Sequence, residues 1–581
     1  MKTQSYIPKN LLKKITSLLL VSLSFCALHA NEVLYNGIEL PEDWPPSQLD
    51  PESTRPMPVP YLKKPPKVIP IDVGRQLFVD DFLIEKTNLT LTYHQAEKFS
   101  GNPVFVAETA EEIRRNEVVY LGQGGVFYDP EESHFKLFYT AGWRGGLAMA
   151  TSKDLIHWTR PDLGKGNGNQ LLPADTAWHG PLSPVAGGDN AVWFDIDETD
   201  ASQKIKYMAC WTHAPKDKQP EGFTHSLQVS DGTNWSRAIR TGIAADYCSF
   251  YYNPFGKTWI YSIKQGGPRG RSRYYSEHPY FLPGANWSNS VYWTNADRLD
   301  KPEPEGAYPG AGEVPQLYSL AGIAYESIMI GMHQIHRGPN NAICDEGNFP
   351  KLTDLEVGFS RDGFHWDRPD RRGFIRGERT EGAWDRAYVH TTTGVFVVVG
   401  DKLVFPYCAY SGTAADGRKG MYTGGRIGLA TLRRDGFASM NAESKTGTLT
   451  TRPVSFSGKH LFVNTDTADG VLRVAVLDKR GRAIEPFTLE SCRPVSTDGT
   501  LVQIHWNGVS DLSSLKDQPV RFQFELTNGS LYSFWVSRDA SGRSDGYVAA
   551  GGPGYPGTVD TVGAKALSQI DSSYHNLLRN P

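Results

Sequence analysis

The stretch Leu147–Trp158 reads LAMATSKDLIHW, an alternating strand followed by a serine, an aspartate-containing turn and a tryptophan. The same unit returns at Leu227–Trp235 (LQVSDGTNW) and at Leu355–Trp366 (LEVGFSRDGFHW), with degenerate copies at Arg273–Ser276 and Ile427–Thr431. Alternation suits a half-buried strand, and the aspartate suits a tight reversal onto which the tryptophan packs the next strand. Five copies indicate five similar β units.

Further strands surround each copy. An inner-strand candidate precedes each one, at residues 118–128, 187–195, 244–253, 312–324 and 386–398. Several strands per copy, repeated around an axis, predict an all-β protein whose main body, residues 71–440, is a five-bladed β-propeller. The alternative is a set of unrelated hairpins in two sandwiches. An extra apolar strand, Gln76–Lys86, is expected to complete the last blade or to enter the first.

The sequence pattern changes after Met440. Apolar strands separated by short polar turns follow, among them Val471–Leu477, Val520–Leu526 and Leu531–Val536. This spacing predicts a C-terminal β-sandwich over residues 441–540. Residues 541–581 form a glycine-rich tail, in which Gly551–Gly557 (GGPGYPG) lacks a following helix and is predicted to be a loop that binds no phosphate.

The first 30 residues have the features of a signal peptide. Basic residues up to Lys14 precede an apolar run, Ile15–Leu28, and Ala30 is a small residue suited to cleavage. The apolar run is too short to span a bilayer. We therefore expect a periplasmic or secreted mature protein that begins with a proline-rich lead-in over residues 31–70.

The mature chain is acidic. Without the four lysines of the leader, 56 basic residues face 64 acidic ones, a net charge of about −8. Such a chain has no electrostatic reason to bind nucleic acid or anionic membranes, and no other apolar segment reaches membrane-spanning length. Five cysteines remain, at positions 210, 248, 344, 408 and 492, and no pair has metal-ligand spacing. We expect no metal site, no cofactor and at least one free thiol.

The repeat resembles a known family. Ala150–Thr159 (ATSKDLIHWT) resembles the blade motif of glycoside hydrolase families 32 and 43, and a propeller followed by a sandwich is the order of family 32. Gln76–Ile84 (QLFVDDFLI), Ser360–Trp366 (SRDGFHW) and Arg434–Met440 (RDGFASM) resemble a broad group of exported bacterial proteins similar to the family 32 N-terminal domain. The resemblance spans roughly residues 70–540. The family 32 signature Trp-Met-Asn-Asp-Pro-Asn and its Arg-Asp-Pro and Glu-Cys motifs are absent, so fructan or sucrose hydrolysis is not expected.

The resemblance implies glycoside hydrolysis, which needs an acid on the leaving oxygen and a base or nucleophile across the sugar ring. Acids stand at the entries of the predicted inner strands: Asp189 in GGDN, Asp246 in AADY and Glu313 in GAGEV. Families 32 and 43 place three acids on successive blades, with a glutamate as general acid in third position. The resemblance therefore implies Glu313 as the acid, and Asp189 and Asp246, in either order, as base or nucleophile and as orienting carboxylate. The alternative reading of each acid is a turn-former or an edge charge.

Other side chains are candidates for substrate binding. Asp80 and Asp81 are adjacent on a strand and point to opposite faces, so at most one faces the channel. Asp81 is the candidate for substrate contact. One of these two aspartates is also the main alternative to Asp189 as a catalytic residue. Trp384 and Asp385 precede the fifth inner strand and could stack on and bond a sugar. His390 enters the same strand, where sugar binding and core packing are the two alternatives.

Arginines alternate at Arg269, Arg271 and Arg273, which places them on one strand face. They form either a solvated edge or a subsite, centred on Arg271, for a carboxylate or sulfate on the sugar, because arginine binds such groups bidentately. His333 and His336 are three apart on a strand and so face opposite sides, which argues against a metal site.

The sequence thus predicts an exported glycoside hydrolase acting on plant or algal oligo- or polysaccharides. Long loops at residues 264–311 and 333–354 would close the site and favour cleavage from chain ends. Two alternatives remain open: a non-catalytic glycan-binding propeller, and a polysaccharide lyase in which a tyrosine or histidine abstracts a proton while arginine neutralises a uronate.

Overall fold

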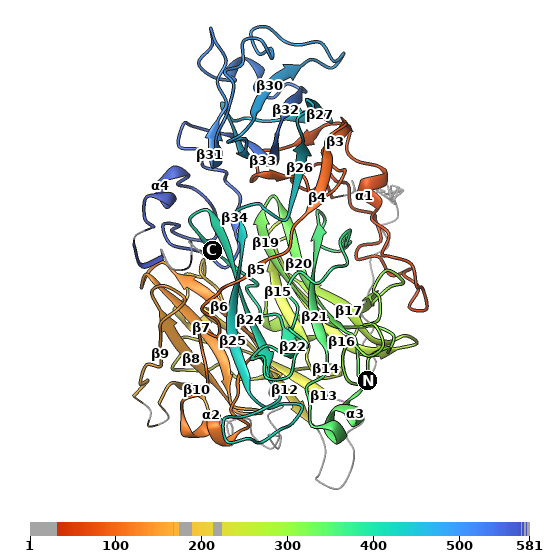
Figure 1. Ribbon diagram of the computed structural model, residues 1–581, viewed down its shortest axis with the longest axis vertical. Coiled ribbons are helices and arrows are strands. Elements are labelled where there is room, and N and C mark those ends of the chain that lie inside the picture. Colours follow the sequence, from red (N-terminus) through yellow and green to blue (C-terminus); the bar gives the residue numbers. More distant parts are fainter. Residues whose placement is uncertain are drawn as a thin grey trace, which may run out of the picture.

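The computed structural model describes residues 32–164, 166, 168–173, 189–212, 223–570, 572–574 and 577. The expected signal peptide lies outside these residues. Within them the chain is almost entirely β, with four short α-helices. The molecule is elongated: Figure 1 shows one group of strands, from the C-terminal part of the chain, at one end and the helices α2 (Ala110–Arg114) and α3 (Asn341–Gly347) at the other.

The largest sheet has nine strands, in the order β10-β8-β7-β6-β11-β12-β13-β14, with β9 on β8. It consists of two antiparallel halves joined where β6 (Val119–Asp129) and β11 (Ala191–Phe194) run parallel, with Gln123 opposite Ala191. The remaining strands are β7 (His134–Ala141), β8 (Gly146–Ser152), β9 (Trp158–Thr159), β10 (Gln170–Leu172), β12 (Ile205–Thr212), β13 (Phe223–Ser230) and β14 (Ile239–Ala244).

Three more sheets complete the main body, in the orders β15-β16-β17-β18, β21-β20-β19-β34 and β22-β24-β25-β5, with β23 also on β24. The first contains β15 (Ser249–Asn253), β16 (Thr258–Gly267), β17 (Gly270–His278) and β18 (Val291–Thr294). The second contains β19 (Gln316–Glu326), β20 (Ile328–His336), β21 (Thr353–Ser360) and β34 (Tyr547–Val548). The third contains β5 (Glu97–Lys98), β22 (Ala387–His390), β23 (Val397–Val399), β24 (Lys402–Tyr410) and β25 (Gly425–Arg433).

The repeated sequence motif forms the predicted strand and turn. After β8, the Ser152 hydroxyl accepts the Leu155 N–H at 2.9 Å, and the Asp154 carboxylate accepts the His157 N–H at 2.8 Å. The Trp158 indole N–H donates to the Leu155 carbonyl at 2.8 Å, and β9 then pairs with β8. The serine and aspartate thus satisfy backbone N–H groups that the reversal leaves without ladder partners.

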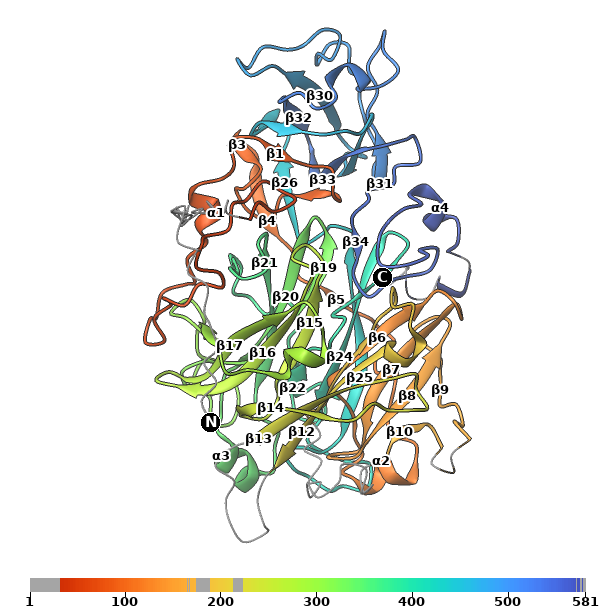
Figure 2. The same cartoon turned by 180° about the vertical axis from the view of Figure 1, so that it is seen from behind.

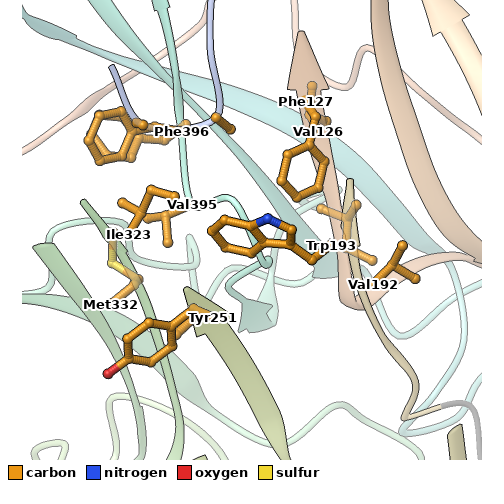
Figure 3. Packing of buried hydrophobic residues seen from close by; sticks show 14 of the residues in the cluster. Val126, Phe127, Val192, Trp193, Tyr251, Ile323, Met332, Val395 and Phe396 are labelled. Atoms are coloured by element: carbon orange, nitrogen blue, oxygen red, sulfur yellow. The ribbon is translucent and has the colours of Figure 1, made fainter. Parts of the chain in front are cut away.

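The first strands of these units meet in the middle of the body. The Gln123 amide of β6 donates to the Ser319 hydroxyl of β19 at 2.7 Å, Gly125 of β6 bridges to Thr393, and β15 contacts β19. Apolar side chains from the same elements fill the space between them, as Figure 3 shows for Val126, Phe127, Val192, Trp193, Tyr251, Ile323, Met332, Val395 and Phe396. This shared core fixes where the first residues of each inner strand lie.

A second core lies between two sheets of the C-terminal part, ordered β31-β29-β33-β26-β4, with β2 on β33, and β3-β27-β32-β30. Their strands are β2 (Gln76–Leu77), β3 (Ile84–Thr87), β4 (Thr90–Tyr93), β26 (Ala438–Ala442), β27 (Gly447–Thr451), β29 (His460–Asp466), β30 (Val471–Leu477), β31 (Asp498–Gln503), β32 (Arg521–Thr527) and β33 (Gly529–Ser537). Figure 1 places them at the end opposite α2 and α3.

Two segments pair differently from the sequence-based expectation. Gln76–Lys86 neither completes the last unit of the main body nor enters the first, because Leu77 pairs with Ser533 and Lys86 with Thr450 in the C-terminal sheets. Short β5 instead closes the last main-body sheet, with Lys98 opposite Ala430. The glycine-rich tail contributes a short strand, because β34 pairs with the end of β19 on the side opposite β20. Gly551–Gly557 is a loop as predicted, but a short helix, α4 (Ala564–Leu567), follows it.

A buried ionic network joins the two parts of the chain. Arg75 Nη1 lies 3.0 Å from Asp435 Oδ2, and Arg434 Nη2 lies 3.0 Å from Glu326 Oε1. These four side chains are at most 1% exposed. The Ser533 hydroxyl of β33 donates to Asp435 at 2.6 Å. The network therefore fixes the C-terminal sheets against the far end of β19.

Asp435→Asn tests this joint. It keeps the shape of the side chain but removes the 3.0 Å charge partner of the buried Arg75 and leaves it only the 3.4 Å contact with Glu326; breaking a buried ion pair typically costs about 3–5 kcal/mol. We expect this loss of stability in urea unfolding followed by tryptophan fluorescence. The control Asp469→Asn replaces an exposed carboxyl in the turn after β29 and should leave the unfolding midpoint in place. Equal midpoints for the two variants would contradict a structural role for the network.

Candidate functional site

Four tyrosines and one histidine from the inner strands meet at the end of the main body that faces away from the C-terminal sheets. We call Tyr120, Tyr247, Tyr318, Tyr388 and His390 the central aromatic cluster. The Tyr247 hydroxyl lies 2.6 Å from His390 Nδ1, and the Tyr318 and Tyr388 hydroxyls are 2.9 Å apart. The Tyr120 ring contacts His390 with centroids 5.1 Å apart, and Tyr247 contacts Tyr318 at 5.2 Å. Side chains from β6, β19, β22 and the start of β15 thus converge on one place.

Two carboxylates stand beside this cluster, Asp189 just before β11 and Asp246 just before β15. The Tyr120 hydroxyl donates to Asp189 Oδ1 at 3.0 Å, and Lys264 of β16 forms an ion pair with Asp246. The Asp246 side chain keeps 37% of its surface exposed, whereas Lys264 is 7% exposed. Asp246 therefore lies at an opening of the site, within reach of a ligand, and its charge partner Lys264 lies deeper in the protein.

The two carboxylates have opposite pKa shifts. Burial and the nearby Asp246 charge raise the pKa of Asp189 to about 7, against the opposing effects of Lys264 and the Tyr120 hydrogen bond. Burial alone would raise the pKa of Asp246 as well, but Lys264, Lys351 and Arg271 outweigh burial and lower it. Near neutral pH one carboxyl thus holds a proton while its neighbour is ionised.

Lys351, in the segment between α3 and β21, approaches the cluster from another side. Its Nζ donates to Asn341 Oδ1 at 2.9 Å and lies over the Tyr388 ring at 4.8 Å and the Tyr422 ring at 5.2 Å. Burial, with the charges of Arg271 and Lys264, lowers the pKa of Lys351 to about 7. Tyr422 in turn stacks on Trp143, with ring centroids 3.9 Å apart. This pair adds a flat aromatic surface beside the carboxylates.

Four of the residues predicted from sequence come together here: Asp189, Asp246, His390 and Arg271. Arg271 of β17 lies over the Tyr318 ring at 5.5 Å and donates to Gln316 Oε1 at 2.9 Å. Glu313, the predicted acid, instead accepts the Asn340 N–H at 2.8 Å at the start of α3. Among the described residues, its hydrogen-bond partners are the backbone and side chain of Asn340. Figure 2 shows α3 and the β12–β14 strands at this same end of the molecule.

Three other candidates lie away from the carboxylate pair. Asp81 is exposed between β2 and β3, in the segment that joins the C-terminal sheets, and its neighbour Asp80 is buried in an ion pair with Arg361 at 2.8 Å. Asp385 forms an ion pair with Lys98 of β5 at 2.8 Å. Trp384 packs on the Tyr407 ring, with centroids 5.6 Å apart. Packing and charge pairing within the protein thus account for Trp384 and Asp385, and the exposed Asp81 lies on the segment that joins the C-terminal sheets.

The sequence reading missed Lys264, Lys351 and most of the tyrosines. A usable signal was present for two of them: Tyr120 and Tyr247 stand within the first residues of a predicted inner strand, as the candidate acids do, whereas Tyr318 is the seventh residue of its predicted strand. The lysines carried no such signal. Lys264 becomes recognisable through the register of β16 against β17, and Lys351 through the path of the segment between α3 and β21.

Metal binding finds no support in the part of the chain that the structure describes, where no group of three or more histidine, cysteine or acidic side chains could hold an ion. His336 stacks on Tyr318, whereas His333 packs on Trp366. The two therefore lie in different surroundings, as their spacing predicted. The five described cysteines are buried and unpaired.

Among the described residues, none of the helices has the length and apolarity needed to cross a bilayer.

Comparison with known proteins gives weak likenesses only. No family model and no curated protein sequence matches the chain. It is similar to an N-acetylgalactosamine deacetylase from F. plautii in complex with blood group B trisaccharide, at 14% identity and a TM-score of 0.40, over 60% of this chain and 96% of that one. An α-L-arabinofuranosidase from Lactobacillus brevis aligns at 11% identity and a TM-score of 0.36, over 58% of this chain and 94% of that one. A thermostable family-43 glycoside hydrolase aligns at 13% identity and a TM-score of 0.35, over 54% of this chain and 90% of that one. Because all three TM-scores are below 0.5, these likenesses assign neither activity nor substrate to this chain.

Tyr247→Phe tests how tightly the cluster is held. The Tyr247 hydroxyl also donates to the Gly122 carbonyl at 2.8 Å in a fully buried setting, so its removal leaves buried polar groups without a partner. Such a loss costs about 1–3 kcal/mol. We expect that decrease in urea unfolding, and almost none for Tyr280→Phe, whose side chain is 70% exposed. A Tyr247→Phe protein as stable as the parent would mean that the hydroxyl does not hold the strands together.

Proposed function

We propose that this protein is an exported glycoside hydrolase that cleaves oligo- or polysaccharides beside the central aromatic cluster. In this proposal the main body is a five-bladed β-propeller and the C-terminal sheets form a β-sandwich. The halves of the nine-stranded sheet and the three smaller sheets supply five antiparallel units whose first strands meet at one place, which supports this reading. The export signal in the first 30 residues is the reason for placing the protein outside the cytoplasm.

The observation that carries the activity is the opposed protonation of Asp189 and Asp246. Hydrolysis of a glycosidic bond needs one carboxylic acid that is protonated at working pH and one carboxylate that is ionised. Asp189, with its pKa raised to about 7, supplies the first, and Asp246, ionised beside Lys264, supplies the second. Asp189 would protonate the leaving oxygen while Asp246 acts from the other side of the sugar, as a base toward water or as a nucleophile.

This assignment moves the acid from Glu313 to Asp189. A general acid works best when its pKa lies near the operating pH, and burial beside a second carboxylate provides that condition at Asp189. The Glu313 carboxylate is engaged by the backbone and side chain of Asn340. Glu313 as acid remains the sequence-based alternative, and the variants below distinguish the two.

The surroundings suit a sugar in two respects. The stacked Trp143–Tyr422 pair is only partly buried and offers a flat apolar surface of the kind that packs against the C–H faces of sugar rings. The two segments predicted as closing loops both reach the site, but neither is simply a loop: residues 264–311 contain β17, which carries Arg271, and residues 333–354 contain α3, which Lys351 follows. Side chains from both segments border the carboxylates, which supports action on chain ends.

Replacing each carboxyl by its amide tests the roles. Proton transfer by a positioned group contributes about 10²–10⁴-fold to rate, so Asp189→Asn and Asp246→Asn should each lower kcat by at least about 100-fold. Glu313→Gln should keep most of the activity. The measurement is release of reducing ends across a panel of plant and algal oligosaccharides. A Glu313→Gln enzyme as inactive as Asp189→Asn would return the acid role to Glu313, and binding without product for the parent protein would indicate a non-catalytic glycan binder.

The pH dependence of kcat/KM has a defined shape. Asp189 must be protonated, so the rate should fall as pH rises through about 7. Asp246 must be ionised, and because its pKa is lowered from the usual value near 4, the acid limb should appear only below about pH 4. A profile that rises from pH 6 to pH 9 would exclude Asp189 as the general acid.

A further inference from the structure

Three cationic side chains surround the Tyr318 ring beside the two carboxylates. Lys264 Nζ lies 4.5 Å from the ring centroid, Lys351 Nζ 5.4 Å and the Arg271 guanidinium carbon 5.5 Å. We call Lys264, Arg271 and Lys351 the cationic cluster. They come from β16, β17 and the segment between α3 and β21, so three separate pieces of chain bring positive charge to one side chain.

The cluster has more positive charge than its own carboxylates balance. Lys264 is paired with Asp246, and Asp189, with its pKa raised to about 7, is only partly ionised at neutral pH. In the described part of the chain, the hydrogen-bond partners of Arg271 and Lys351 are the neutral side chains of Gln316, Asn341 and Tyr422. Arg271 therefore has no carboxylate bonded to it, and its charge, with that of Lys264, drives Lys351 toward the neutral form; a bound anion would offset this positive charge and lower the free energy of the site.

Arg271 is the member of the cluster that a ligand can reach. It is partly exposed, whereas Lys264 and Lys351 are buried to 5% and 1% exposure. Its neighbour Arg273 is fully buried and donates to the Tyr247 and Tyr318 carbonyls. Of these two arginines on β17, Arg273 therefore holds the structure together and Arg271 is available to a ligand. A guanidinium with one edge held by Gln316 presents its other edge in a fixed direction, which suits a carboxylate or sulfate.

From this geometry we propose that the cationic cluster is a subsite for an anionic group on the sugar, a uronate carboxylate or a sulfate ester, and that the protein acts on acidic glycans. Arg271 contacts the anion directly, and Lys264 and Lys351 act on it through their charge from behind the Tyr318 ring. The inference rests on the proposed function, because it takes the glycan to bind beside Asp189 and Asp246.

Binding by the Asp189→Asn protein tests the subsite without turnover. Calorimetry would compare uronate-containing trisaccharides from pectin and alginate with their carboxyl-reduced forms, and sulfated oligosaccharides from carrageenan with their desulfated forms. A charge-assisted pair is worth about 1.5–3 kcal/mol, so at least one acidic ligand should bind about tenfold or more tightly than its neutral counterpart. The arm that shows the preference identifies the anion as carboxylate or sulfate.

Arginine variants in the same background locate the effect. Arg271→Ala should abolish the preference for the acidic ligand, and Arg271→Lys should retain part of it, because it keeps the charge but not the two-pronged geometry. The matched control Arg480→Ala removes an exposed arginine in the turn after β30 and should keep the full preference. Equal affinity for every acidic and neutral pair, or a full preference in Arg271→Ala, would overturn the subsite.

Proton uptake gives a second readout that loss of structure would not imitate. The charged and titratable groups around Lys351 are Arg271, Lys264, Asp246, Asp189 and Cys344, with the neighbouring tyrosines and with His336 and His390, which burial keeps neutral. An anion at Arg271 raises the pKa of Lys351 from about 7, so binding at pH 7.5 should take up protons. Calorimetry in two buffers of different ionisation enthalpy measures this uptake. Asp189→Asn removes the competing titration of Asp189, and Lys351→Met should then abolish the uptake; undiminished uptake would contradict the role of Lys351.

The outcomes separate the subsite from the hydrolase. An acidic glycan that binds through Arg271 but is never cleaved by the parent enzyme, or is cleaved to an unsaturated product that absorbs in the ultraviolet, would support the subsite and overturn hydrolysis. Hydrolysis confined to neutral glycans, with no acidic preference in binding, would overturn the subsite and leave the hydrolase intact.

Discussion

The Asp246–Lys264 ion pair is the interaction on which the candidate site depends. It keeps one carboxyl ionised at the opening of an otherwise buried cluster, and that negative charge helps to raise the pKa of Asp189. Lys264 is the largest of the three cationic influences that oppose the effect of burial on Asp246, so without it the pKa of Asp246 would rise and the two carboxyls would become more alike. Breaking such a pair by removing one partner is costly, because it leaves the other charge uncompensated. One ion pair between β16 and the start of β15 thus creates the chemical asymmetry of the site.

The fold makes this arrangement possible by bringing many short strands to a common centre. Each antiparallel unit contributes the entry of its first strand, so residues as distant in sequence as Tyr120 and His390 come into contact. The units are fastened in three places: β5 closes the last sheet through Lys98, β34 extends the sheet of β19, and the Arg75–Asp435 pair joins the C-terminal sheets to the same end of β19. This joint lies away from the site, whereas Arg271 on β17 and Lys351 between α3 and β21 lie beside the two carboxylates.

The sequence predicted the parts of this account that repeat. The strand-turn-tryptophan motif at Leu147–Trp158 marked the β units, and the position of Asp189 and Asp246 at inner-strand entries brought both into the site. The roles of residues outside the repeat were harder to predict. Trp384 and Asp385 also precede an inner strand, but a tryptophan that packs on Tyr407 and an acid that pairs with Lys98 of a distant strand cannot be told from ligand-binding residues by pattern alone. The partner of Gln76–Lys86 was likewise hidden, because β2 and β3 pair with strands more than 360 residues away.

The protonation of Asp189 is the most direct test of the central claim, and it needs no substrate. Difference infrared spectroscopy between the parent protein and Asp189→Asn, recorded across the pH range, isolates the stretching band of this protonated carboxyl. The account predicts a protonated band that persists at pH 6 and disappears around pH 7, and that disappears at lower pH in an Asp246→Asn background, where the neighbouring charge is gone. A band already lost by pH 5, or one indifferent to Asp246, would contradict the account.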